Sequence, residues 1–499
     1  MSKKYHKQQH NTSVSSPRGG REGVFYIILL ALLLFFAFYT ATQFPYTYIT
    51  MEGDNFWVLT WDFWHLKLAT MPAVSTWLAD YLMQYYSSVP VAACIQTLPL
   101  GIVGVLAHAV LKKIFGNTWL SWLGLLPPVL LGFYCTFSLA FMIQWVFLFA
   151  LILVFQYIRN FSGRLLFSLL CVPVGFLFMT TPLLAILLLV LFISPQYLPH
   201  GEKVWRPSLG KVGMGLLSLF LLWITPRIYS QQVVFISYDQ RYTDWGTYFD
   251  PLTSTYNRDG EYIKKCVCLA NEGRWEDLLY KEHIKSDAQR GIGTALRYAL
   301  LAESVLGTLP ENLLDYPVND ENQFLYPHQT SRISLQLNRL FYLNLGVYDE
   351  AFHHAQEYNL LMPNGNSFSS LRQMIDYSIE EGEWEIAEKF LEILSKSSCH
   401  NRFVEERRST MEKAKKNFNK NIALRADNFV GGYPFPVEML RLARYYNDSP
   451  NRKKMIDYAI CAYMIRGDFN SFTIALNAFN IYKEKELPKA YRIFKDSFK

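Results

Sequence analysis

Two acidic residues close together, in a segment rich in aromatic side chains, are the part of this sequence most suited to chemistry. Glu52 and Asp54 flank Gly53 in the sequence MEGDNFW. A glycine between two carboxylates is typical of a turn, and such a pair can hold a divalent cation or act as a general base. The alternative is a polar turn that caps a helix starting near Phe56.

The segment that holds this pair lies between apolar stretches. Half of the 499 residues are hydrophobic (51%) and only 18% are charged, whereas soluble proteins carry about a quarter charged residues. The first 226 residues carry a net charge of +7 and the rest −1. Because the positive charge belongs to the apolar half, a nucleic-acid partner is not expected. Seven apolar runs predict about seven membrane spans: Val24–Phe44, Val89–Leu111, Trp119–Phe137, Leu139–Ile158, Leu165–Phe178, Leu183–Ile193 and Val212–Thr225.

Basic residues in the short loops predict the orientation of these spans. With the N-terminus in the cytoplasm, the inner segments hold twelve basic residues and the short outer segments only Lys67. We therefore expect the protein to lie in the bacterial inner (cytoplasmic) membrane, with its N-terminus in the cytoplasm and its C-terminal domain in the periplasm. The twelve are Lys3, Lys4, Lys7, Arg18, Arg21, Lys112, Lys113, Arg159, Arg164, Lys203, Arg206 and Lys211.

The second half of the chain has a helical pattern with a recurring motif. A glycine is followed two residues later by an aromatic residue in Gly273-Arg-Trp275, Gly346-Val-Tyr348, Gly382-Glu-Trp384 and Gly467-Asp-Phe469. The second and third copies are 36 residues apart, close to the tetratricopeptide period of about 34. The glycines are expected to end one helix, and the aromatic residues to begin the next.

These patterns predict an all-α protein with four parts. Residues 1–23 form a basic cytoplasmic tail, and 24–226 a membrane domain with an outer loop at 45–88. Residues 227–260 form a linker, and 261–499 a tetratricopeptide-like repeat domain. Within the outer loop, the aromatic cluster around Trp57, Trp61 and Trp64 and an amphipathic helix at 75–86 are expected at the membrane interface.

An uncleaved first span followed by a long outer loop with early acids resembles the GT-C glycosyltransferase superfamily. The resemblance implies a glycosyl- or oligosaccharyltransferase that uses a polyprenyl-phosphate-linked sugar donor and a protein or glycan acceptor. It implies Asp54 or Glu52 as catalytic base or as ligand of a divalent cation, Mg²⁺ or Mn²⁺. Asp62, Arg227 and Arg241 are further candidates for binding the substrate, since an arginine can clamp a lipid phosphate.

The sequence departs from that superfamily in one respect. A second acidic motif in a later outer loop is missing, because Tyr134–Ser138 and Met179–Pro182 contain no acids. The alternative is therefore a non-catalytic scaffold, with a membrane anchor and a periplasmic repeat domain that binds peptides or proteins.

Overall fold

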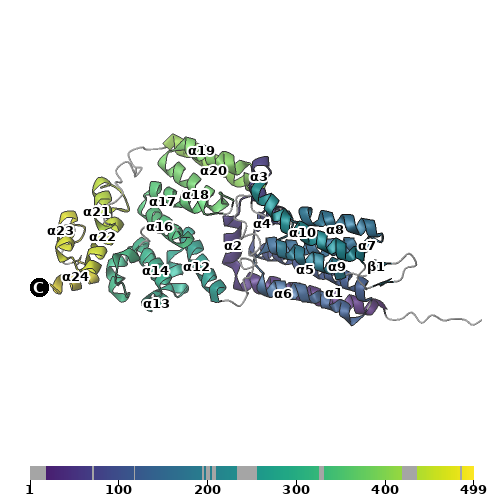
Figure 1. Ribbon diagram of the computed structural model, residues 1–499. Helices are drawn as coiled ribbons and strands as arrows, with labels where there is room; N and C mark the ends of the chain where they lie inside the picture. Colours follow the sequence, from purple (N-terminus) through teal and green to yellow (C-terminus); the bar gives the residue numbers. More distant parts are fainter. Residues whose placement is uncertain are drawn as a thin grey trace, which may run out of the picture. The chain divides into compact units, whose positions relative to one another are not determined.

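The chain folds almost entirely into helices (Figure 1). The only strands among the described residues are the two-residue pair β1 (Gln196–Tyr197) and β2 (Lys203–Val204), which are antiparallel. The computed structural model describes residues 18–69, 72–116, 118–193, 196–197, 203–204, 209–232, 255–324, 331–362, 364–417, 435–483 and 486–498. The chain divides into two units, residues 1–43, 67–79 and 90–253, and residues 44–66, 80–89 and 254–499.

The first unit contains the long apolar helices. Four helices of the described chain are long and apolar enough to cross a membrane, and they occur within α1 (Arg18–Gln43), α5 (Val89–Phe115), α7 (Leu139–Tyr157) and α10 (Leu209–Gln232). Shorter apolar helices are η1 (Trp119–Leu125) with α6 (Leu126–Tyr134), α8 (Phe161–Gly175) and α9 (Thr181–Ile193). The separate apolar runs Leu165–Phe178 and Leu183–Ile193 correspond to two separate helices, α8 and α9.

The second unit contains amphipathic helices that pack against their neighbours in sequence. In Figure 1, α16 to α20 follow one another as adjacent green helices, and each of them packs against the next. The helices are α12 (Thr255–Asn271), η3 (Asp277–Lys281), α13 (Ile284–Gln289), α14 (Gly293–Leu306), α15 (Leu309–Asn312), η4 (Leu313–Asp315), η5 (Glu321–Gln323), α16 (Arg332–Leu345), α17 (Tyr348–Leu360), α18 (Phe368–Glu381), α19 (Trp384–Ser395), η6 (Ser398–His400), α20 (Asn401–Asn417), α21 (Phe435–Tyr445), α22 (Arg452–Arg466), α23 (Phe469–Phe479) and α24 (Lys489–Asp496).

Glycines end three of these helices as the motif predicts. Gly346, Gly382 and Gly467 are the C-caps of α16, α18 and α22, with φ of 76°, 77° and 69°. This left-handed conformation costs glycine little and lets its N–H bond to the carbonyls left open at the helix end. Each next helix begins at the aromatic residue two positions later, so the predicted helix boundaries are confirmed.

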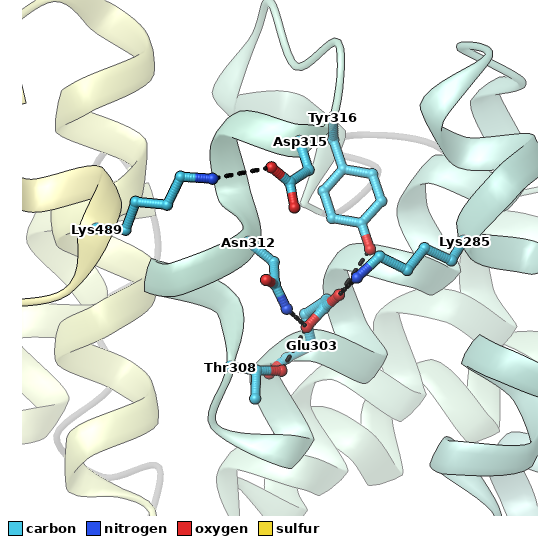
Figure 2. Close-up of polar contacts among 7 residues, drawn as sticks. All are labelled: Lys285, Glu303, Thr308, Asn312, Asp315, Tyr316 and Lys489. Carbon is cyan, nitrogen blue, oxygen red and sulfur yellow. Dashed lines mark hydrogen bonds and ion pairs between the residues drawn. The ribbon is translucent and has the colours of Figure 1, made fainter. Parts of the chain in front are cut away.

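A buried carboxylate organises the turn after α14. Figure 2 shows Thr308, Asn312 and Tyr316 pointing at Glu303, whose side chain is fully buried. Asn312 Nδ2 and Tyr316 OH donate hydrogen bonds of 2.8 and 2.7 Å, and Lys285 Nζ lies 3.6 Å away. Several donors around one anion offset its loss of hydration, so the cluster fixes this turn.

The outer loop is divided between the two units. Its segments 44–66 and 80–89 belong with residues 254–499, and 67–79 belong with the apolar helices. The loop forms three helices: α2 (Pro45–Asp54), α3 (Trp61–Ala69) and α4 (Ala73–Met83). The helix expected at 75–86 is thus present. The expected aromatic interface cluster is only partly correct, because Phe56, Trp57 and Phe63 are buried in protein while Trp61 is 71% exposed.

Candidate functional site

Helix α2 is held at its N-terminus by a side chain more than two hundred residues away. The Glu261 carboxylate, on α12, accepts hydrogen bonds from the backbone N–H groups of Tyr46 and Thr47 at 2.6 and 2.8 Å. It also accepts one from the Thr47 hydroxyl at 2.5 Å. The first N–H groups of a helix have no partner within the helix and carry a partial positive charge. Glu261 therefore caps α2 from the second half of the chain.

The end of α2 is held by α18 and the turn before it. Phe368 N donates to Asn55 O at 3.1 Å, and Asn364 Nδ2 donates to Phe56 O at 3.2 Å. Asn364 Nδ2 also lies 3.1 Å from the Asp80 carboxylate, and Asn55 Nδ2 donates to Asp80 O at 2.7 Å. Residues 44–66 and 80–89 of the outer loop thus belong with the helical unit, whereas residues 67–79 belong with the apolar helices.

A cavity of about 810 Å³ lies between α2 and the helices α12, α16, α17 and α18. Its volume is in the range of small-molecule and peptide pockets. The apolar part of its wall includes Ile49, Ile263, Val267, Ile333 and Leu343. The charged residues in its wall are the acids Glu52, Asp54, Asp259, Glu272 and Asp376 and the bases Lys264, Arg332, Arg339 and Arg372.

The two acids of the EGD sequence line this cavity, but they do not form the expected pair. Gly53 lies in the last turn of α2 instead of a free turn. Residues two apart on a helix point to different sides. A Cβ on Gly53 would lie 3.4 Å from that of Ser369, at van der Waals contact distance, so α2 and α18 lie close together here.

Asp54 is directed to α17. Its Oδ1 accepts a hydrogen bond of 2.9 Å from Tyr358 OH. Burial raises the pKa of Asp54, and the bond from Tyr358 and the charges of Arg332 and Lys264 oppose that shift.

Glu52 belongs to another part of the cavity wall. Burial raises its pKa, and the charge of Arg372, on α18, opposes the shift. The two carboxyls therefore have separate partners. The described residues contain no group of three His, Cys, Asp or Glu side chains that could hold a metal ion. The divalent cation stays a prediction from the resemblance, and the diverging pair does not fit a shared metal site.

A hydrogen-bonded chain of side chains continues from Asp54 along the cavity. Tyr358 accepts from the Gln336 side chain, and Gln336 Oε1 accepts from Arg339 Nε and Nη2 at 3.2 and 3.0 Å. Arg339 Nη1 donates to Tyr377 OH at 2.7 Å. The Arg339 side chain is only 1% exposed.

Asp62 and Arg227, which were also predicted to bind substrate, are not among the residues that line this cavity. Asp62 is exposed on α3. Arg227 is exposed on α10 in the first unit, with its guanidinium 4.6 Å from the centroid of the Trp223 ring. Arg241 lies outside the described residues.

Several cavity residues were not among those predicted from the sequence. Gln336, Arg339 and Tyr358 are buried polar residues within amphipathic helices. The one available signal was the charge of Arg339 within the apolar run LQLNRLFYL, because an arginine is almost never fully buried unless it is paired.

Comparison with known proteins gives a family for the whole chain. A model described as a family of unknown function, DUF6057, matches residues 22–492. The chain belongs to the DUF6057 family. No curated protein and no solved structure matches it. The DUF6057 match covers both α2 and the helices that surround the cavity, so the whole candidate site lies within the family region.

Proposed function

We propose that this DUF6057 protein is a membrane-anchored binding protein, whose helical domain takes up a peptide segment in the cavity. The observation that carries the proposal is the cavity of about 810 Å³, with an apolar wall and nine charged side chains. A mixed wall of this kind suits a peptide, which offers apolar side chains, backbone amides and charges. The tetratricopeptide-like pattern supports it, since helical repeats present concave surfaces to peptides.

The proposal includes the arrangement expected from the sequence. Four long and three shorter apolar helices form seven spans, with the N-terminus in the cytoplasm and the helical domain in the periplasm of a bacterial inner-membrane protein. The excess of basic residues in the inner loops supports this orientation. A periplasm-only reporter fused at the C-terminus is expected to be active, and a cytoplasm-only signal would reverse the orientation.

A peptide array tests the binding function. The full chain, purified in detergent, is applied to random-sequence nonapeptides, and Ile333→Trp is compared with Ile474→Trp. Ile333 lines the cavity, whereas Ile474 is 69% exposed on α23 away from it. The larger side chain at 333 is expected to fill part of the cavity and abolish selective binding, and the change at 474 to leave it intact. No selective binding by the unaltered chain, or equal binding by the Ile333 variant, would refute the proposal.

A GT-C-like glycosyltransferase is the second candidate, and one observation favours it. Asp54 lies in the cavity wall and burial raises its pKa, which is the direction that strengthens a carboxylate as a general base. In this role Asp54 would take the proton of an acceptor hydroxyl while the hydroxyl oxygen attacks the anomeric carbon of the sugar. The bond from that carbon to the phosphate oxygen would break, and the lipid phosphate would leave.

Glycan profiles of cells distinguish the two candidates. For a transferase, Asp54→Asn is expected to lower transfer by about 10²–10⁴-fold, as for removal of a general base. Glu405→Gln, a change at an exposed site on α20, serves as the matched control. Unchanged glycans in the Asp54 variant, with altered glycans after deletion of the protein, would exclude the catalytic role.

A further inference from the structure

The charges of the cavity wall are not evenly matched. Three of the four basic residues interact electrostatically with a cavity acid: Arg372 with Glu52, and Arg332 and Lys264 with Asp54. These three cations therefore have anionic counterparts within the cavity.

Arg339 is the exception. Its hydrogen-bond acceptors are the neutral side chains of Gln336, Tyr377 and Asn271. Among the residues that the structure describes, no carboxylate lies within 4.0 Å of its guanidinium, and the side chain is 1% exposed. These neutral acceptors replace part of the hydration that the buried cation loses, but they do not balance its charge. An anion in the cavity would supply the opposite charge.

Donors for such an anion are already in place. A guanidinium has five N–H groups, and the bonds of Arg339 to its three neighbours use four of them. One Nη1–H remains. Tyr377 accepts from Arg339, so its own hydroxyl proton is available to a second acceptor. Both residues line the cavity.

The surroundings favour a singly charged anion. Glu52, Asp54 and Asp376 also line the cavity and would repel a phosphate dianion. Two donors on adjoining side chains match in number the two oxygens of one carboxylate.

We propose that Arg339 and Tyr377 bind a carboxylate group of the ligand. The inference rests on the proposed function, since in a peptide this group is either the free C-terminus or the side chain of Asp or Glu. The ligand class becomes a carboxylate-bearing peptide, whose two carboxylate oxygens accept hydrogen bonds from Arg339 and Tyr377.

Acetate is the probe for the site itself. Thermal unfolding of the full chain in detergent is followed with increasing sodium acetate, at constant ionic strength made up with chloride. Acetate is expected to stabilise the unaltered chain in a saturable way. Arg339→Gln is expected to weaken acetate binding by about tenfold or more, because charge-assisted hydrogen bonds are the stronger kind. Arg402→Gln, at a 92% exposed arginine paired with Glu406, is the control and should match the unaltered chain.

Tyr377→Phe is a second cavity variant, which keeps the test decisive if Arg339→Gln does not fold. It keeps the ring and removes the hydroxyl, which accepts from Arg339 Nη1 and, in this proposal, donates to the ligand. It should therefore also weaken acetate binding while the chain stays folded. The carboxylate site would be overturned if acetate stabilises the unaltered chain no more than chloride does. It would also be overturned if acetate stabilises both cavity variants as much as the unaltered chain.

Three peptide sets separate this inference from the proposed function: free C-termini, amidated peptides with Asp or Glu, and amidated peptides with neither. Binding confined to either carboxylate set supports the site and identifies the source. Equal binding of all sets keeps the binding function and overturns the carboxylate site. An acetate effect without peptide binding keeps the site and overturns the peptide function.

Discussion

The carboxylate of Glu261 is expected to decide whether α2 stays docked. It accepts two backbone N–H bonds and one hydroxyl bond, and its residue is only 9% exposed. Hydrogen bonds to a charged group contribute about 1.5–3 kcal/mol each, and they are not additive. Loss of a helix cap costs about 0.5–2 kcal/mol. For Glu261→Ala we therefore expect the free energy of opening α2 to fall by about 3 kcal/mol.

Hydrogen–deuterium exchange measures this opening locally. A fall of about 3 kcal/mol corresponds to roughly 150-fold faster exchange of the α2 amides, if they exchange by local opening. Glu261→Gln keeps an acceptor oxygen without the charge, so its exchange should increase less. The matched control is Glu276→Ala, an exposed residue that follows α12. Unchanged α2 exchange in Glu261→Ala would refute the capping role.

Two further predictions concern buried acids. Burial, and to a smaller extent the neighbouring Asp349 carboxyl, raises the pKa of Glu381 to about 9. The folded protein therefore keeps a proton that the unfolded chain releases near pH 4.5. Stability should then fall as the pH rises from about 5 to 9, and Glu381→Gln should flatten that dependence and raise the melting temperature at pH 8; an unchanged pH profile would contradict this. Asp80 is 9% exposed and accepts from Asn364 Nδ2 at 3.1 Å, so Asp80→Ala should destabilise the helical domain by about 1–3 kcal/mol; denaturant unfolding without a lower midpoint would contradict it.

Local signals in the sequence predicted the helix ends well. Gly346 and Gly382 adopt the left-handed conformation at the ends of α16 and α18, because a glycine cap is a property of a few neighbouring residues. The apolar runs likewise predicted α1, α5 and α7, since the length and composition of an apolar run can be seen directly in the sequence.

The candidate site was only partly predictable. Glu52 and Asp54 were identified, but their separation on a helix was not, because Gly53 is typical of a turn until the close approach of Ser369 is known. The cap joins Glu261 to Tyr46 and Thr47, which lie 215 and 214 positions before it in the sequence. Such contacts depend on tertiary packing, which no local pattern encodes. Similarly, Trp384 begins α19 as predicted, yet its side chain is only partly buried.

Helix α2, from the loop after the first apolar helix, forms one wall of the cavity in the helical domain. A disulfide between Gly53→Cys and Ser369→Cys tests it directly. The Cβ positions are 3.4 Å apart, close to the 3.5–4.5 Å typical of disulfides. After mild oxidation of the full chain in membranes, mass spectrometry should find the peptides containing positions 53 and 369 linked to each other, and each single-cysteine variant should lack that link. If the double variant is folded and inserted but positions 53 and 369 do not link, α2 does not dock on α18 and does not form a wall of the cavity.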